Sequence, residues 1–244
     1  MKFKNYIIPL PLILFLSCTS LKVITPEKFT KIVSKPVELW SYEDCDNIIL
    51  KYTSFNKKGY ENKFVNVTNN GERVYIMATP LNEYVILAKI KKESIIRRYS
   101  ENDYKKRLKE ELEFYTNKTL NLSDGSIILK GGLEKFYQDK ISFDITFENI
   151  SEPREPIEIE YASEGFFLEN STGDFARVVD VSGYYVDDYF VLIDKLKMVV
   201  TFSIYDDNGK SLFNDTNSGK GHKLVFNGIQ PEPILVEWGE ENKK

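Results

Sequence analysis

The sequence is poor in the side chains on which most catalytic and metal sites depend. Its 244 residues include one histidine, His222, and two cysteines, Cys18 and Cys45. A Ser-His-Asp or Cys-His catalytic site would have to use His222, which lies in a glycine-rich stretch expected to form a loop. Zinc needs several nitrogen or sulfur ligands that converge, so a zinc site is not expected. We expect no cofactor.

Several motifs and charge patterns are missing as well. Neither the G-x-S-x-G elbow nor the G-x-x-x-x-G-K-[ST] phosphate loop occurs. Three carboxylate pairs occur without the spacing of an EF-hand: Asp44/Asp46, Asp187/Asp188 and Asp206/Asp207. The net charge of −4 is only mildly acidic, which suits solubility and argues against nucleic acid as the main partner.

Long apolar runs are absent except at the start of the chain. Lys2 and Lys4 precede an apolar run from Tyr6 to Leu16. At 1.5 Å per residue this run covers only about half a bilayer, so it is too short to span one. A basic start followed by a short apolar stretch is typical of a secretory signal peptide.

The end of that run, Phe15-Leu16-Ser17-Cys18, resembles the lipobox of bacterial lipoproteins. The family usually has Leu at the position of Phe15, and relaxed boxes of this kind are similar to those of spirochaetes. The resemblance implies cleavage after Ser17, a diacylglycerol on the Cys18 thiol and a fatty acid such as palmitate on the new amine. Two or more acyl chains anchor a protein stably. The alternative is an ordinary cleaved signal with a chance cysteine.

This resemblance implies a protein of the bacterial cell envelope, anchored through Cys18 to the outer membrane or to the outer face of the plasma membrane. A lipidated Cys18 would leave Cys45 without an intramolecular partner. A lone cysteine of this kind is most often a small buried hydrophobic residue, although a reactive thiol or a bridge between chains remains open.

The pattern of the chain divides it into five parts. We expect a signal peptide at 1–17, a lipidated N-terminus and tether at 18–40, a small α+β domain at 41–133, a β-sandwich domain at 134–238 and a tail at 239–244. The boundary after Leu133 follows the Gly131-Gly132 break.

Within 41–133 the pattern predicts one helix and several strands. Ser100 begins a capping-box-like start, and apolar residues at helical spacing predict a helix from Glu101 to Tyr115. The predicted strands are Ile48–Tyr52, Phe64–Val67, Val74–Ala78, Tyr84–Ile90 and Ser126–Leu129.

From Phe136 onward nearly every segment reads as a short strand. Apolar and polar residues alternate from Ile141 to Glu148, which predicts a strand with one buried and one wet face. The further predicted strands are Ile157–Tyr161, Phe175–Val181, Val186–Ile193, Met198–Tyr205, Ser211–Phe213, Leu224–Phe226 and Ile234–Trp238. This spacing favours an antiparallel sandwich that is immunoglobulin-like in architecture, without the Cys–Trp–Cys core of true immunoglobulin domains.

Two surface features are candidates for binding. The aromatic run contains Tyr184, Tyr185 and Tyr189, and tyrosines bury area at low entropy cost; they could equally lie at sheet edges beside the core. The second feature is a basic cluster that could touch lipid headgroups or an acidic partner, or simply form a solvated face: Lys89, Lys91, Lys92, Arg97 and Arg98.

The sequence assigns no reaction. The favoured interpretation is a non-catalytic binding or scaffolding lipoprotein, whose partner is an envelope protein or a surface ligand. An envelope hydrolase that uses a carboxylate pair is the alternative, because any two carboxylates can meet in space.

Overall fold

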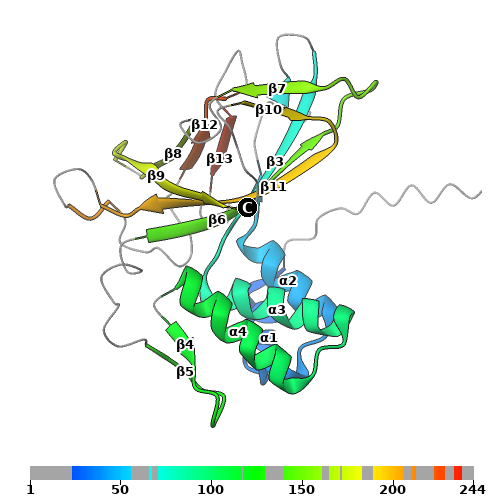
Figure 1. Ribbon diagram of the computed structural model, residues 1–244, viewed down its shortest axis with the longest axis vertical. Helices are drawn as coiled ribbons and strands as arrows, with labels where there is room; N and C mark the ends of the chain where they lie inside the picture. The colour runs from blue at the N-terminus through cyan, green and yellow to red at the C-terminus, as the bar shows by residue number, and fades with distance from the viewer. Residues whose placement is uncertain are drawn as a thin grey trace, which may run out of the picture.

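The computed structural model describes the chain in segments: residues 24–55, 66–67, 71–116, 118–129, 140–160, 165–170, 172–182, 189–205, 210–212, 223–228 and 234–237. Helices form one layer, and a large antiparallel sheet lies on top of it (Figure 1). The signal peptide, Cys18, His222 and the tail at 239–244 lie outside the described residues.

The helices begin at polar residues that cap their free N–H groups. Thr25, Ser41, Asn82 and Ser100 each accept a hydrogen bond from a backbone N–H in the first turn of the helix that follows. The helices are α1 (Pro26–Val33), the 3₁₀ turn η1 (Val37–Leu39), α2 (Tyr42–Tyr52), α3 (Glu83–Arg97) and α4 (Glu101–Tyr115).

The strands occupy most of the remaining described chain. They are β1 (Ser54–Phe55), β2 (Asn66–Val67), β3 (Arg73–Pro80), β4 (Lys118–Leu120), β5 (Ile127–Leu129), β6 (Lys140–Asn149), β7 (Ile157–Glu160), β8 (Phe166–Glu169), β9 (Phe175–Ser182), β10 (Tyr189–Leu192), β11 (Lys195–Ser203), β12 (Lys223–Phe226) and β13 (Ile234–Glu237).

Nine of the described strands form one sheet, in the order β1-β3-β6-β11-β9-β8-β12-β13 with β2 beside β3. Residues of β13 contact β1 and β3, so the two ends of the sheet approach each other. The sheet is therefore nearly closed and sandwich-like. Two further pairs of strands are separate from this sheet: β7 with β10, and the β4–β5 hairpin, which lies beside the helices (Figure 1).

Phenylalanine rings hold the two halves of the sheet together. The ring centroid of Phe147 on β6 lies 6.0 Å from that of Phe166 on β8 and 5.1 Å from that of Phe226 on β12. All three side chains are buried, and edge-to-face pairs of this kind add to the free energy gained from burial. The prediction of a strand-rich, sandwich-like part is confirmed at this level.

The expected tether is wrong over its described part. Ile24, Ile32 and Trp40 are buried in the core of the helical layer, together with Ile48 and Leu112. The sequence from Pro26 to Trp40 lacks a long apolar period, but a short helix and a 3₁₀ turn suffice to bury Ile32 and Trp40.

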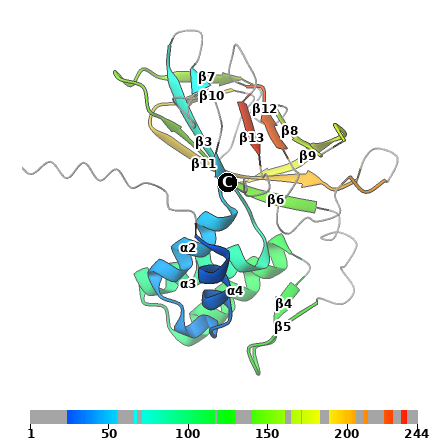
Figure 2. The same cartoon turned by 180° about the vertical axis from the view of Figure 1, so that it is seen from behind.

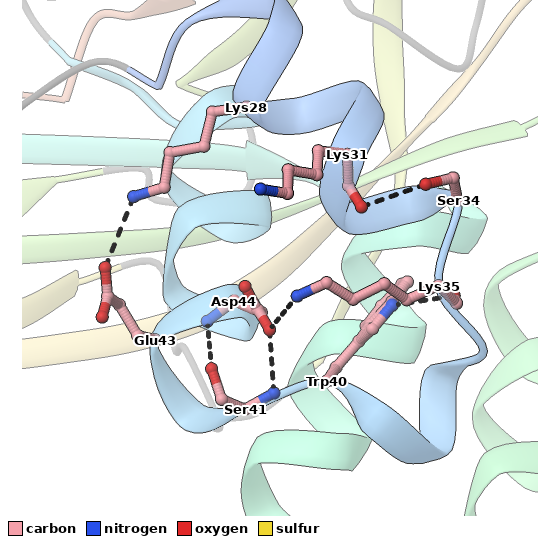
Figure 3. Close-up of polar contacts among 8 residues, drawn as sticks. All are labelled: Lys28, Lys31, Ser34, Lys35, Trp40, Ser41, Glu43 and Asp44. Atoms are coloured by element: carbon pink, nitrogen blue, oxygen red, sulfur yellow. Dashed lines mark hydrogen bonds and ion pairs between the residues drawn. The ribbon is translucent and has the colours of Figure 1, made fainter.

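Polar contacts also tie this segment to α2 (Figure 3). Lys28 pairs with Glu43 at 3.3 Å, and Lys35 pairs with Asp44 at 3.2 Å. The indole N–H of Trp40 donates to the carbonyl of Lys35. Residues 24–40 therefore belong to the folded body.

Two predicted strands are helical. Ile48–Tyr52 is the second half of α2, and Tyr84–Ile90 is the first half of α3. A short apolar run fits a buried helix as well as a buried strand, and periodicity alone does not separate the two. The caps decide: Ser41 and Asp44 form a capping box, and the Asn82 side chain accepts from the Val85 N–H.

Other predictions for residues 41–133 agree with the structure. The helix Glu101–Tyr115 is confirmed with both of its bounds, and β3 and β5 occupy the predicted positions. For Phe64–Val67, the structure describes only Asn66 and Val67, which form β2. Farther along the chain, β8 (Phe166–Glu169) was not predicted.

The expected boundary after Leu133 does not divide the sheet. Strand β3 pairs with β6 from Val74↔Asn149 to Pro80↔Phe143. Val74, Ile76 and Ala78 lie in the same buried core as Phe143 and the later strands. The structure thus places β1, β2 and β3 in one sheet with strands that follow the expected boundary.

The predicted wet face of β6 is also wrong in part. Ser142 and Thr146 on this face are buried, and the Ser142 hydroxyl lies 2.8 Å from that of Thr201 on β11. The helical layer covers this face, which sequence alternation alone does not reveal.

Candidate functional site

A cleft of about 610 Å³ opens where α3 and α4 meet the covered face of the sheet. Its lining is a mixture of apolar side chains and charges. The residues are Ile49, Thr79, Leu81, Ile86, Lys89, Ile90, Lys92, Glu93, Ile96, Arg97, Arg107, Glu111, Tyr115, Asp144 and Lys197. A volume of this size suits a small molecule or a short segment of a larger one.

Helix α3 supplies one wall because its spacing brings Lys89, Glu93, Ile96 and Arg97 to one face. The Arg97 Nε lies 3.1 Å from a carboxylate oxygen of Glu93, which also accepts from the Tyr99 hydroxyl at 2.8 Å.

Helix α4 supplies the facing wall. The Arg107 guanidinium lies 2.7 Å from a carboxylate oxygen of Glu111. Tyr115 is half-buried at the inner end, and the pKa of its hydroxyl is raised mainly by burial and further by Glu111, while a hydrogen bond with Ser182 acts in the opposite direction. The phenol therefore stays protonated and serves as a hydrogen-bonding group.

The floor of the cleft comes from the sheet. Asp144 on β6 is held by Lys89 at 2.6 Å. Lys197 on β11 pairs in the ladder with Thr146, its side chain is exposed, and it forms no ion pair with another described residue. Lys197 is thus a cation left free at the floor.

The charges of the lining do not cancel. Five basic and three acidic side chains line the cleft. Each of the three carboxylates already has a cation: Asp144 has Lys89, Glu93 has Arg97 and Glu111 has Arg107. Of the other two cations, Lys92 is paired with Asp46, whereas Lys197 has no ion-pair partner among the described residues. The cleft therefore favours an anionic group over a cationic one.

The predicted basic cluster is only partly a solvated face. Lys89 and Lys92 bind Asp144 and Asp46, and the Lys91 ammonium donates to the Glu38 carbonyl at 2.9 Å. These cations attach α3 to its neighbours, and Lys89, Lys92 and Arg97 line the cleft. The basic cluster was visible in the sequence, but the residues that its lysines contact lie far away along the chain.

The predicted tyrosine site is described only in part. Tyr184 and Tyr185 lie outside the described residues. Tyr189 begins β10, where it pairs with Glu160 on β7, and only its backbone is described. Their role in binding stays a prediction.

The remaining sequence candidates have structural roles where they are described. Cys45 is fully buried, as predicted, and burial raises the pKa of its thiol to about 11. Asp44 caps α2. In the described part of the chain, no three His, Cys, Asp or Glu side chains gather as metal ligands would.

The described helices include none that is both long and apolar enough to cross a bilayer. No family model matches the chain, and neither does any curated protein. Among solved structures, a crystal structure of the YjhA protein from Bacillus subtilis is similar over 37% of this chain and 57% of that one. The two chains are 18% identical in sequence and superpose with a TM-score of 0.24. This similarity is too partial to assign a family or a function.

Proposed function

We propose that this protein is a lipid-anchored lipoprotein of the bacterial cell envelope and that its folded part is a non-catalytic binding module. The lipobox-like sequence that ends at Cys18 supports the anchor. The cleft between α3, α4 and the sheet supports the binding role. Its ligand is a molecule, or a part of an envelope partner, that carries a carboxylate or phosphate group.

The observation that carries the binding role is the charge balance of the cleft. All three carboxylates in the lining are already ion-paired, whereas Lys197 is not paired within the described chain. A ligand anion at Lys197 would displace no internal partner. The apolar side chains of Ile86, Ile90 and Ile96 would contact the rest of the ligand.

The cleft is tested by thermal unfolding of the purified mature protein with inorganic phosphate, with citrate and with spermidine. We expect the two anions to raise the melting temperature and spermidine to leave it unchanged. Lys197→Ala should reduce the rise. Lys195→Ala is the matched control, because Lys195 is two residues away on the same strand and does not line the cleft.

Phosphate also stabilises folded proteins non-specifically, so the comparison between the two lysine variants decides the result. An equal response of both variants to both anions would contradict binding in the cleft. Affinity capture from intact envelope, with the wild type and Lys197→Ala in parallel, then identifies the natural partner.

The anchor is tested in the native host by phase partitioning in detergent. The wild type should enter the detergent phase, and Cys18→Ala should stay in the aqueous phase, because it lacks the acyl chains. A Cys18→Ala protein that partitions like the wild type would place the anchor elsewhere.

The alternative of a hydrolase with a carboxylate pair has less support. A general acid and a general base or nucleophile need two carboxylates that face one bond. In the cleft, Glu93, Glu111 and Asp144 each contact a basic side chain instead. Hydrolysis of a substrate that depends on one of these three carboxylates would support this alternative.

We also infer that the sandwich-like part is immunoglobulin-like in architecture. Antiparallel strands whose buried faces meet across Phe147, Phe166 and Phe226 support this class. An experimental structure in which the strand order matches a closed barrel instead would contradict it.

A further inference from the structure

The helical layer carries exposed apolar residues in η1, at the start of α2 and near the C-terminal end of α3. Leu39 is 69% exposed, Tyr42 45% and Ile95 40%. Isolated exposed apolar residues are ordinary, but several together on one surface indicate an interaction site. We call Leu39, Tyr42, Ile95 and Arg98 the helical tip.

The contacts of Lys91 and Lys92 place these residues beside one another. The Lys91 ammonium donates to the carbonyl of Glu38, next to Leu39, and the Lys92 ammonium lies 4.5 Å from the ring centroid of Tyr42. Ile95 lies one turn after Lys91 and three residues after Lys92, so it is the next neighbour of both on the surface of α3. Leu39, Tyr42 and Ile95 thus surround two lysines.

The tip also has the composition of a surface that meets lipid headgroups. Tyrosine has an apolar ring and a polar end, and lysine and arginine can bury their stems while their charges stay in water. Arg98 follows α3 directly and is exposed. The cleft is lined by Lys92, Ile96 and Arg97 of the same helix but by none of the four tip residues, so the tip and the cleft adjoin without sharing these four side chains.

The length of chain before the helical layer limits how far the layer can stand from the membrane. Ile24 lies only six residues after Cys18 along the chain. Fully extended, they reach about 20 Å, which is about two helix diameters. Ile24 is 4% exposed in the core of the helical layer, so this position already belongs to the folded body.

We propose that the helical tip docks on the surface of the bilayer that holds Cys18, with Leu39 and Ile95 at the level of the lipid headgroups and the sheet directed away from the membrane. This proposal rests on the proposed lipidation of Cys18. The anchor confines the helical layer to the bilayer, and the tip then needs only weak apolar contacts to fix the orientation. The cleft is thereby presented beside the membrane surface.

The test uses the full lipidated protein, purified in detergent and reconstituted into phosphatidylcholine vesicles. Leu39→Cys is labelled with a fluorophore, and quenching by lipids with brominated acyl chains is measured. Ile193→Cys is the matched control, because Ile193 is 63% exposed and directly follows β10. Both views place β10 at the end of the molecule opposite the helices (Figures 1 and 2). Buried Cys45 sets the background in unmodified protein.

We expect quenching at Leu39 to be severalfold stronger than at Ile193, and Ile95→Glu to reduce it without releasing the protein from the vesicles. Equal, weak quenching at both sites in a protein that floats with the vesicles would leave the anchor intact and overturn docking. Stronger quenching at Ile128→Cys, on the β4–β5 hairpin, than at Leu39→Cys would show that another face meets the membrane and would overturn docking of the helical tip. A protein that does not float overturns the anchor and docking together.

Discussion

Replacing Ile76 by alanine tests whether β3 is part of the sandwich-like core. Ile76 is 1% exposed and lies opposite Phe147 in the ladder between β3 and β6. Its side chain packs in the core cluster that contains Phe143 and Phe202. Truncation of a buried isoleucine to alanine costs about 2–5 kcal/mol, from lost burial and from the cavity that remains.

That loss is a large fraction of the about 5–15 kcal/mol that stabilises a typical folded protein. The assay is urea unfolding followed by far-UV circular dichroism, with Ile95→Ala as the control. Ile95 is 40% exposed, so its truncation should change the unfolding free energy by less than about 0.5 kcal/mol. If Ile76→Ala were as mild as Ile95→Ala, β3 would not belong to the core, and the pairing with β6 would be wrong.

Four further results are expected. The segment 134–238 expressed alone should melt without cooperativity, because it lacks β3; a sharp melt would restore the boundary after Leu133. Burial raises the pKa of Asp44, but hydrogen bonds from its capping box and Lys35 outweigh this and hold it below its ordinary value of 3.8. Asp44→Ala should therefore lower the unfolding free energy by about 1 kcal/mol at pH 7. In urea titrations this difference should shrink as the pH falls below 3.8, because a lowered pKa in the folded state stabilises only the ionised carboxylate. Arg98 has φ 54°, so Arg98→Gly should raise the unfolding free energy by about 1 kcal/mol; a lower melting temperature would show that its side chain matters more than its backbone. Tyr184→Ala with Tyr185→Ala should abolish partner capture and leave the melt unchanged if the tyrosines form a contact, whereas an unfolded variant would place them in the core.

Helix α4 was predictable in both bounds, because it combines a capping serine with apolar residues at helical spacing and a charged outer face. Helices α2 and α3 were not, because their apolar runs carry no clear period. In α3, five residues from Val85 to Ile90 are buried, and a helix buried on several sides loses its amphipathic pattern.

The cleft was hidden from the sequence for a different reason. Its cations were visible as the basic cluster, but the partners that decide their role, Asp46 and Asp144, lie in other elements. Arg107 and Lys197 come from two further elements, and neither spacing nor composition relates them. Only the packing of α3 and α4 on the sheet brings these residues to one place.

The position of the helices between two neighbouring strands has a consequence for the order in which the chain folds. Strand β3 ends at Pro80, and its partner β6 begins only at Lys140, with α3, α4 and the β4–β5 pair between them. A chain synthesised from its N-terminus presents β3 long before β6. The helices can form early from local contacts, whereas the edge of β3 waits for a distant partner. Until β6 is available, this edge of β3, with Val74 and Ile76, is open to pairing with another chain.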